Sequence, residues 1–337
     1  MKTITFVVPC YNSQDYMKRC IDSLLPSGKE GEIIIVDDGS TDKTGEIADT
    51  YAALYPAQIK VIHKENGGHG SGVNAGLEAA AGRFFKVVDS DDWLDEKALS
   101  VLLTQLKKQH SLPDMVVCNY IYDHLHENRQ HRVSFDNVFP ADSICSWSCM
   151  GRFRSSQYLV MHALIFRTVL LKEIGLRLPE HTFYVDNLFA CRPLPKVKRI
   201  LYLDLDLYHY FLGRSDQSVN EISYMRRIDE QIRVTKLVAD SVNFGEVKQI
   251  TPKLERYLLR NLSIMLSICD IFLLMMKTKE ALHKRRQLWE FIRNKDEKLY
   301  MRLRFTTISG ATYLPGRLGG MLTLAGYRMA KSFLGFA

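Results

Sequence analysis

Three carboxylates follow directly on a predicted buried strand. The apolar run 84–88 ends at Asp89, Asp91 and Asp92, which lie within four residues. Like charges this close repel one another, and they are stable together only beside a cation or hydrogen-bond donors. Hard oxygen ligands of this kind suit Mg²⁺ or Mn²⁺, which in turn hold substrate phosphates. The simpler interpretation is that Asp91 or Asp92 caps a helix beginning near Trp93, but one aspartate would be enough for that.

Residues 8–12 and 64–74 also follow predicted strands. In the first segment Pro9 fixes the backbone and Tyr11 offers a flat face on which a ring can stack. The second is a Gly-rich loop that leads into a helix, an arrangement that lets backbone N–H groups approach a phosphate. It matches neither the P-loop nor the dinucleotide-binding pattern, so it indicates phosphate binding without a particular nucleotide fold.

A second acidic segment follows another buried strand. Asp37 and Asp38 come before Gly39, which permits a tight turn, and paired acids suit a contact with the N–H group of a ring. The alternative interpretation is a cap for the helix that follows, which Ser40 or Asp42 would supply.

The first half of the chain alternates strand and helix patterns. Near-continuous apolar runs predict buried parallel strands, and amphipathic spacing predicts the helices between them. The predicted strands are residues 3–8, 32–36, 59–63 and 84–88, and the predicted helices are residues 15–25, 42–55, 72–81 and 95–108. This order predicts an α/β fold with a doubly wound, mostly parallel sheet flanked by helices. Because ligands lie at the carboxyl ends of the strands in such sheets, the four polar segments should share one rim.

The second half of the chain is less regular. Short strands are predicted at residues 115–118, 160–166, 200–203 and 207–210, and from about residue 221 onward the pattern is almost wholly helical. We therefore expect one domain over residues 1–220 and a helical region over residues 221–337. Seven scattered cysteines without a zinc-binding pattern favour reduced thiols and a cytoplasmic location. The apolar start of the chain is too short for a signal peptide.

The charge of the chain is distributed unevenly. Residues 225–337 carry 21 Lys and Arg and 10 Asp and Glu, a net charge of +11, and because the whole chain carries +7 the first 224 residues carry −4. A basic carboxyl-terminal region favours an anionic partner. An apolar stretch within it, residues 257–276, contains Arg260, Asn261 and Asp270. Because charges in mid-span are costly, it is predicted to be a buried or surface-lying helix instead of a membrane span.

The last predicted helix has an apolar stripe. Its members are Leu318, Met321, Leu322, Ala325, Met329 and Phe333, and the basic residues Arg317, Arg328 and Lys331 lie off the stripe. Two interpretations fit this pattern equally well: an interfacial helix on anionic lipid, or a helix docked on the rest of the chain.

Together and in this order, the four polar segments resemble those of the GT-A glycosyltransferases of family 2. The resemblance is carried by VVPCYN, VDDGSTD, NGGHGSGVNAG and DSDD, covers residues 3–110 closely and covers residues 150–220 more loosely. It implies that residues 1–220 form a GT-A-like catalytic domain with a nucleotide-diphosphate sugar across the rim of the sheet. By position, the implied donor-binding residues are Pro9, Tyr11, Asn12, Asp38, Asn66, Gly67, Gly72, Asp89, Ser90 and Asp91, with the base, usually uracil, at Pro9, Tyr11 and Asp38. The Asp89–Asp91 pair would handle the ribose and a Mg²⁺ or Mn²⁺ ion.

Two later segments are assigned by the same resemblance. Family members usually take the general base from an acidic pair at the start of a helix. Here that pair reads Val185-Asp186, so only the second acid is present and Asp186 is the expected base; its plain alternative is a helix cap. The segment 208–219 resembles the loop that closes on the donor, in which Arg214 would clamp phosphate and His209 would contact metal or phosphate.

The leading hypothesis is an inverting, metal-dependent glycosyltransferase. It would move a sugar, with a UDP-sugar as the expected donor, to a hydroxyl of a glycan, a lipid-linked glycan or a cell-wall polymer, and a cation would neutralise charge on the leaving phosphate. The alternatives are a non-catalytic sugar-nucleotide-binding or scaffold protein, a nucleotidyltransferase on the same fold, and a nucleic-acid-binding protein that uses the basic helices. No reader motif supports the last of these, so we expect no nucleic-acid partner. The carboxyl-terminal helices would serve peripheral attachment to the inner face of a membrane or a homo-oligomer.

Overall fold

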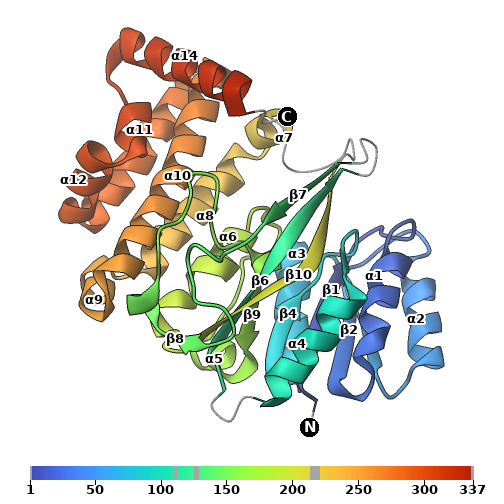
Figure 1. The fold of residues 1–337 in the computed structure, drawn as a ribbon. Coiled ribbons are helices and arrows are strands. Elements are labelled where there is room, and N and C mark those ends of the chain that lie inside the picture. The colour runs from blue at the N-terminus through green and yellow to red at the C-terminus, as the bar shows by residue number, and fades with distance from the viewer. Residues whose placement is uncertain (1, 109–111, 125–128, 213–220, 335–337) are drawn as a thin grey trace. The chain divides into compact units, whose positions relative to one another are not determined.

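The structure is a computed structural model that describes residues 2–108, 112–124, 129–212 and 221–334. The chain divides into two compact units, unit 1 over residues 1–214 and unit 2 over residues 215–337. Figure 1 shows that unit 1 is built on a sheet and that the described part of unit 2 is helical.

Unit 1 contains a ten-stranded sheet. Its strands are β1 (Ile4–Cys10), β2 (Gly31–Asp37), β3 (Ile59–His63), β4 (Phe84–Val87), β5 (Trp93–Leu94), β6 (Met115–His124), β7 (Arg129–Val133), β8 (Ile144–Cys145), β9 (Leu164–Arg167) and β10 (Ile200–Leu212). They are ordered β3-β2-β1-β4-β9-β6-β10-β5, with β7 beside β6 and β8 beside β10. Strands β1 to β4 are parallel, as are β6 and β10, whereas β9 is antiparallel to both of its neighbours. The predicted α/β fold with a mostly parallel sheet is confirmed.

Helices connect and cover these strands. They are α1 (Met17–Leu24), η1 (Leu25–Glu30), α2 (Thr44–Leu54), α3 (His69–Ala79), α4 (Glu96–Lys108), η2 (Trp147–Cys149), η3 (Met161–Ala163), α5 (Thr168–Glu173), α6 (Asp186–Cys191) and η4 (Leu194–Lys196). The spacing of apolar residues along α1 lets the helix bury one face. Helix α3 packs closely on β1 at a glycine. A Cβ at Gly76 would lie 2.3 Å from Val7 Cγ1.

The sheet has a topological switch point between β1 and β4. The chain proceeds from β1 outward to β2 and β3, and then returns to β4 on the other side of β1. In sheets of this kind, ligands bind at the carboxyl ends of the strands beside such a switch point. The segments after β1 and β4 are residues 11–13 and 88–92, two of the four polar segments of the sequence.

Some predicted boundaries are wrong. Residues 200–203 and 207–210 belong to one strand, β10, whose register with β6 shifts between Leu203 and Tyr208. Residues 161–163 form a 3₁₀ turn ahead of β9, and α3 begins three residues earlier than predicted. Such irregularities arise from pairing with distant strands, which local periodicity does not report.

The segment after the carboxylates also differs from its simpler interpretation. Trp93 and Leu94 pair with β10 as strand β5, and the helix begins only at Glu96. Asp95 caps it, because Asp95 Oδ1 accepts a hydrogen bond from Ala98 N at 2.8 Å. The interpretation of Asp91 or Asp92 as the cap of a helix at Trp93 is therefore wrong.

Unit 2 is a bundle of helices. They are α7 (Glu221–Arg226), α8 (Ile228–Ser241), α9 (Phe244–Ile250), α10 (Pro252–Met276), α11 (Lys279–Lys295), α12 (Glu297–Thr306), α13 (Ile308–Thr312) and α14 (Gly316–Leu334). Polar caps begin several of them, with Asn243, Thr251, Thr278 and Asp296 accepting hydrogen bonds from the first-turn N–H groups. The long helix α10 packs against most of the others.

Of the described helices, α10 alone is long and apolar enough to cross a membrane, judged by length and composition. Within the structure 61% of its most apolar stretch is buried. Asp270 on α10 is fully buried and accepts hydrogen bonds from Arg285 Nε at 3.0 Å, from Trp289 Nε1 at 3.1 Å and from Thr312 Oγ1 at 3.1 Å. These contacts place α10 in the core of unit 2, where the carboxylate of Asp270 is paired.

Candidate active site

Hydrogen bonds join the loops that follow the parallel strands. Asn12 Oδ1, after β1, accepts a hydrogen bond from Thr41 N, after β2, at 2.8 Å. Ser13 Oγ lies 2.8 Å from Ser90 Oγ, in the loop after β4. The backbone of Asn12 has a φ of 50°, which asparagine tolerates better than most residues. The loops after β1, β2 and β4 thus form one edge.

Asp38 joins the Gly-rich loop to this edge. The carboxylate is buried and accepts hydrogen bonds from Gly67 N at 3.0 Å, from Gly68 N at 2.6 Å and from Lys64 Nζ at 2.7 Å. The prediction that the four polar segments share one rim is therefore confirmed. In the structure the Asp38 carboxylate holds the Gly-rich loop. Its contact with the nucleotide base stays a prediction.

Two glycines of the Gly-rich loop already have structural roles. The N–H of Gly67 is directed to Asp38, and the N–H of Gly72 lies inside α3 and bonds to Gly68 O at 3.3 Å. A Cβ at Gly72 would lie 3.0 Å from Pro9 Cβ, so Gly72 serves close packing of α3 on β1. A contact of Gly67 and Gly72 with the nucleotide-sugar stays a prediction.

Asp89 is paired with a histidine from the same loop. His69 Nε2 lies 2.9 Å from Asp89 Oδ1. Burial alone would raise the pKa of Asp89, but the charge and the hydrogen bond of His69 outweigh it and lower that pKa. For His69 the opposite holds, since burial is outweighed by the charges of Asp89 and Asp186, and the pKa of His69 is raised. His69 stands within the predicted loop, but its role was missed.

Asp92 is buried beneath the rim and fully engaged. Its Oδ2 accepts a hydrogen bond from the Tyr208 hydroxyl at 2.6 Å, and its Oδ1 accepts one from Phe211 N at 2.8 Å. The same Tyr208 hydroxyl accepts a hydrogen bond from Asp89 N at 3.1 Å. Burial, with the charges of Asp91 and Asp89, raises the pKa of Asp92 well above its ordinary value. Asp92 therefore fixes the shape of the turn through β10.

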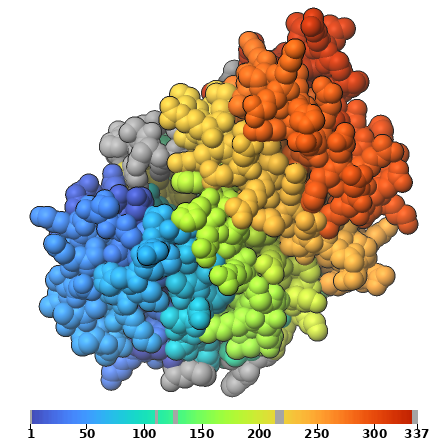
Figure 2. All heavy atoms as spheres, turned by 180° about the vertical axis from the view of Figure 1, so that it is seen from behind, coloured from blue at the N-terminus to red at the C-terminus, as the bar shows by residue number. Residues whose placement is uncertain are grey.

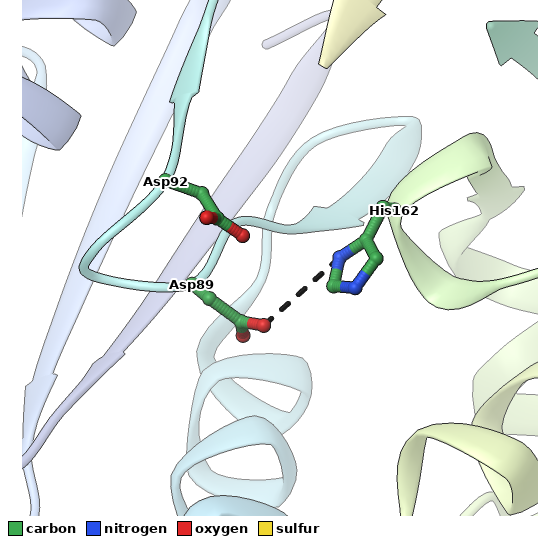
Figure 3. Close-up of side chains that lie close together, drawn as sticks. All are labelled: Asp89, Asp92 and His162. Atoms are coloured by element: carbon green, nitrogen blue, oxygen red, sulfur yellow. Dashed lines mark ion pairs between the residues drawn. The ribbon is translucent and has the colours of Figure 1, made fainter. Parts of the chain in front are cut away.

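A second histidine, in η3 just ahead of β9, points at Asp89. His162 Nδ1 lies 4.0 Å from Asp89 Oδ2 (Figure 3) and has no hydrogen-bond partner within the described residues, although it is buried. Burial lowers the pKa of His162 to about 4, so the ring is neutral. Its backbone carbonyl accepts a hydrogen bond from the buried Lys86 Nζ at 2.7 Å. Lys86 was recognisable in the sequence only as one charge inside an apolar strand.

These residues fit a divalent cation. Ligand atoms of Asp89, Asp92 and His162 lie within 4.8 Å of one another (Figure 3). A neutral, unpartnered imidazole beside a carboxylate is a donor set that suits Mn²⁺ better than Mg²⁺, which prefers oxygen ligands. Because both oxygens of Asp92 already accept hydrogen bonds, we regard Asp89 and His162 as the more suitable members. Asp91 is half-buried in the same turn.

His209 is not part of this group. Its Nδ1 lies 3.2 Å from Asp123 Oδ2, and its ring stacks on Trp93 at a centroid distance of 5.1 Å. The Arg19 guanidinium stacks on the same tryptophan ring, 3.1 Å from its centroid. Alternation along β10 turns Tyr208 toward Asp92 and the next side chain elsewhere, and a role of His209 as a metal ligand stays a prediction.

Asp186 reaches the rim from the second half of unit 1. It is the first residue of α6, and its carboxylate accepts hydrogen bonds from backbone N–H groups of that first turn, so the helix-cap and the general-base interpretations both stay predictions. Burial raises the pKa of Asp186, and the charge of His69 opposes this shift. The segment before it is held on the Gly-rich loop, since His181 N donates to Gly67 O at 2.6 Å. The structure thus brings Asp186 into electrostatic range of Asp89.

The remaining predicted residues are placed as follows. Tyr11 is 53% exposed at the rim, as a stacking platform requires. Asn66 is exposed, and its Nδ2 donates to Asp38 O at 3.0 Å. Arg214 lies outside the described residues.

Known proteins resemble this chain in sequence and in fold. Residues 5–163 match the profile of Glycosyl transferase family 2. The chain is 30% identical to glycosyltransferase GlyG of Streptococcus pneumoniae over 72% of this chain and 81% of that protein. It is 32% identical to the uncharacterized glycosyltransferase EpsJ of Bacillus subtilis over 68% of this chain and 66% of that protein.

Two further likenesses concern TarS, the poly(ribitol-phosphate) beta-N-acetylglucosaminyltransferase of Staphylococcus aureus. The sequences are 25% identical over 65% of this chain, which spans only 37% of TarS. The crystal structure of TarS 1-349 in complex with UDP-GlcNAc superposes with a TM-score of 0.68 over 98% of this chain and 92% of that one. At 21% identity this likeness shows a common GT-A fold. The chain is a glycosyltransferase and belongs to Glycosyl transferase family 2.

Proposed function

We propose that this enzyme transfers a sugar from a UDP-sugar to a hydroxyl group of a glycan, a lipid-linked glycan or a cell-wall polymer. The observation that carries the proposal is the convergence of Asp89 and Asp186 on His69 at the switch point of the sheet. One carboxylate comes from the loop after β4 and the other from the start of α6, so two chemical roles can meet at this edge of the sheet. The complexes of TarS 1-349 with UDP-GlcNAc and UDP support the choice of donor.

The nucleotide would lie along the rim. The exposed ring of Tyr11 is available to stack on the uracil, and Pro9, Asn12, Asp38 and Asn66 form or hold the loops around it. Ser90 continues this edge through its contact with Ser13. Because Asp38 fixes the Gly-rich loop by three donors, the loop is already shaped for a donor before one binds, which lowers the entropic cost of binding.

The diphosphate end of the donor would lie toward the carboxylates. Asp89 and Asp91 would hold a Mn²⁺ or Mg²⁺ ion together with His162. When bound, such an ion neutralises the negative charge that develops on the leaving phosphate. His69 orients Asp89 through its hydrogen bond, and Tyr208 and Asp92 fix the turn from below.

Asp186 would act as the general base in a single displacement. The acceptor hydroxyl loses its proton to the Asp186 carboxylate while its oxygen forms a bond to the anomeric carbon. The bond from that carbon to the phosphate oxygen breaks, and UDP leaves with the electron pair, so the configuration at the anomeric carbon is inverted. A carboxyl whose pKa is raised by burial holds the incoming proton better than an exposed one would.

The acceptor and the location are proposed from a relative and from the cysteines. The likeness to a poly(ribitol-phosphate) transferase supports a cell-wall polymer or a related glycan. None of the seven cysteines forms a disulfide, which supports a reducing, cytoplasmic location.

Thermal stability against a panel of nucleotides tests the donor site. The purified chain would be melted with UDP, UDP-sugars, GDP and CMP, each with and without Mn²⁺. We expect UDP and its sugars to raise the melting temperature and Mn²⁺ to enlarge the shift, because ligands that bind only the folded state stabilise it. If no nucleotide shifted the transition at millimolar concentration, the non-catalytic scaffold hypothesis would replace this one.

A further inference from the structure

The last helix of unit 2, α14, presents an apolar stripe to solvent. Leu318, Met321, Leu322 and Met329 are 76%, 67%, 65% and 59% exposed. At 3.6 residues per turn they fall with Ala325 on one stripe about 100° wide. Figure 2 shows α14, in red, at the surface of the molecule.

The opposite face of α14 docks the helix and fixes its orientation. Gly319 and Gly320 are buried, and a Cβ on Gly320 would lie 3.2 Å from Leu274 Cδ2 of α10. Further along the helix, the Tyr327 hydroxyl donates to Glu221 Oε1 at 2.8 Å. Close packing at these glycines and the hydrogen bond of Tyr327 thus hold the face opposite the stripe against the rest of unit 2. The sequence left open whether the stripe or another face is docked, and in the structure it is not the stripe.

The charge on α14 has one sign. Residues 316–334 contain Arg317, Arg328 and Lys331 and no Asp or Glu. Lys331 pairs with Glu221 at 2.7 Å, whereas Arg317 and Arg328 are exposed and form no ion pair within the described part of the chain. On the helical wheel both arginines lie beside one edge of the apolar stripe. An apolar face bordered by exposed cations is complementary to a surface with acyl chains below a layer of negative charge.

We propose that α14 docks this glycosyltransferase on the surface of an anionic lipid membrane, with its axis in the plane of the interface. Leu318, Met321, Leu322 and Met329 enter the acyl boundary, and Arg317 and Arg328 contact lipid phosphates. A second copy of the chain is a poorer occupant, since in a two-fold dimer the same patch meets itself and α14 has no acid to neutralise the cations of its partner. The proposal does not depend on the donor chemistry proposed above.

Sedimentation of the full chain with lipid vesicles tests the proposal, without nucleotide. Vesicles of phosphatidylcholine with phosphatidylglycerol would be compared with vesicles of phosphatidylcholine alone. We expect binding to the anionic vesicles only. Replacing Met321 and Leu322 by Glu should reduce it at least about tenfold, and Arg317→Gln and Arg328→Gln should each reduce it about fivefold. The control is Leu54→Glu, an equally exposed leucine on α2, which should bind as the wild type does.

Three results would overturn the proposal. The first is no binding to anionic vesicles. The second is a loss of binding with the arginine variants but not with M321E/L322E, which would indicate a soluble polyanion as the partner. The third is unchanged vesicle binding by M321E/L322E together with a change from dimer to monomer, which would assign the stripe to self-association. Because all substituted side chains are exposed, an unchanged melting temperature verifies that each variant is folded.

Discussion

Removing one hydroxyl group, in Tyr208→Phe, should loosen the turn that carries the carboxylates. The hydroxyl is buried, donates to Asp92 Oδ2 at 2.6 Å and accepts from Asp89 N at 3.1 Å. Because the pKa of Asp92 is raised well above its ordinary value by burial, both bonds count as ordinary buried ones, worth about 1 kcal/mol each. We therefore expect the free energy of unfolding of unit 1 to fall by about 2 kcal/mol. For a unit of this size that lowers the melting temperature by roughly 4–8 °C.

The neighbouring Tyr210→Phe is the matched control for this measurement. The Tyr210 ring also contacts His162, at a centroid distance of 4.7 Å, but its hydroxyl forms no hydrogen bond with the described residues. Differential scanning calorimetry should show a loss below about 1 kcal/mol for the control. Tyr208→Phe should also weaken UDP-sugar binding, because Asp89 N loses its acceptor. If both variants melted within about one degree of each other, the support of the turn by Tyr208 would be refuted.

Three further predictions address separate parts of the molecule. Asp270→Asn leaves the Arg285 guanidinium buried without a counter-charge and should destabilise unit 2 by about 3–5 kcal/mol, seen by calorimetry; a loss under about 1 kcal/mol would contradict the pairing. Gly39→Ala should cost about 1–3 kcal/mol and weaken UDP binding in titration calorimetry, because its φ is +73° and its Cβ would lie 2.7 Å from Asn66 N; an unchanged affinity would count against a preformed loop. His162→Ala should abolish most of the Mn²⁺-dependent rise in melting temperature with UDP, and a full rise in the variant would remove His162 from the cation site.

The rim of the active site was predictable because it depends on local signals. Apolar runs that end in Asp, Gly and Asn identify strands and the loops after them, and the handedness of parallel crossovers then places those loops on one edge. Asp89 was found in this way, whereas Asp186 was assigned only by the family resemblance.

The supporting contacts were not predictable, because they join residues far apart in the sequence. Tyr208 reaches Asp92 from 116 residues away, and His162 faces Asp89 across β9. Which strand face a side chain occupies depends on register, and β10 shifts its register beside β6. A change by one residue would exchange Tyr208 for His209 beside Asp92, and local periodicity does not fix this choice.

The role of the Gly-rich loop was also not visible in the sequence. Glycine spacing indicates backbone N–H groups close to an acceptor, but it does not tell a phosphate from a carboxylate of the same protein. The acceptor in the structure is Asp38. The exposure of the apolar stripe of α14 was not predictable for the same reason. Periodicity reveals a stripe, but only packing determines whether other residues cover it.

The rate at which the Asp186→Asn variant releases UDP from a UDP-sugar tests the central proposal most directly. The variant and the wild type would be compared for UDP release and, on the same samples, for UDP affinity. Glu180→Gln serves as the control, because this acid lies in the same segment but is about half exposed and pairs with Arg177. We predict that Asp186→Asn slows release by at least about 100-fold while its UDP affinity changes less than about threefold, and that the control behaves as the wild type does. Release at near-wild-type rate by Asp186→Asn would contradict the assignment of Asp186 as the base.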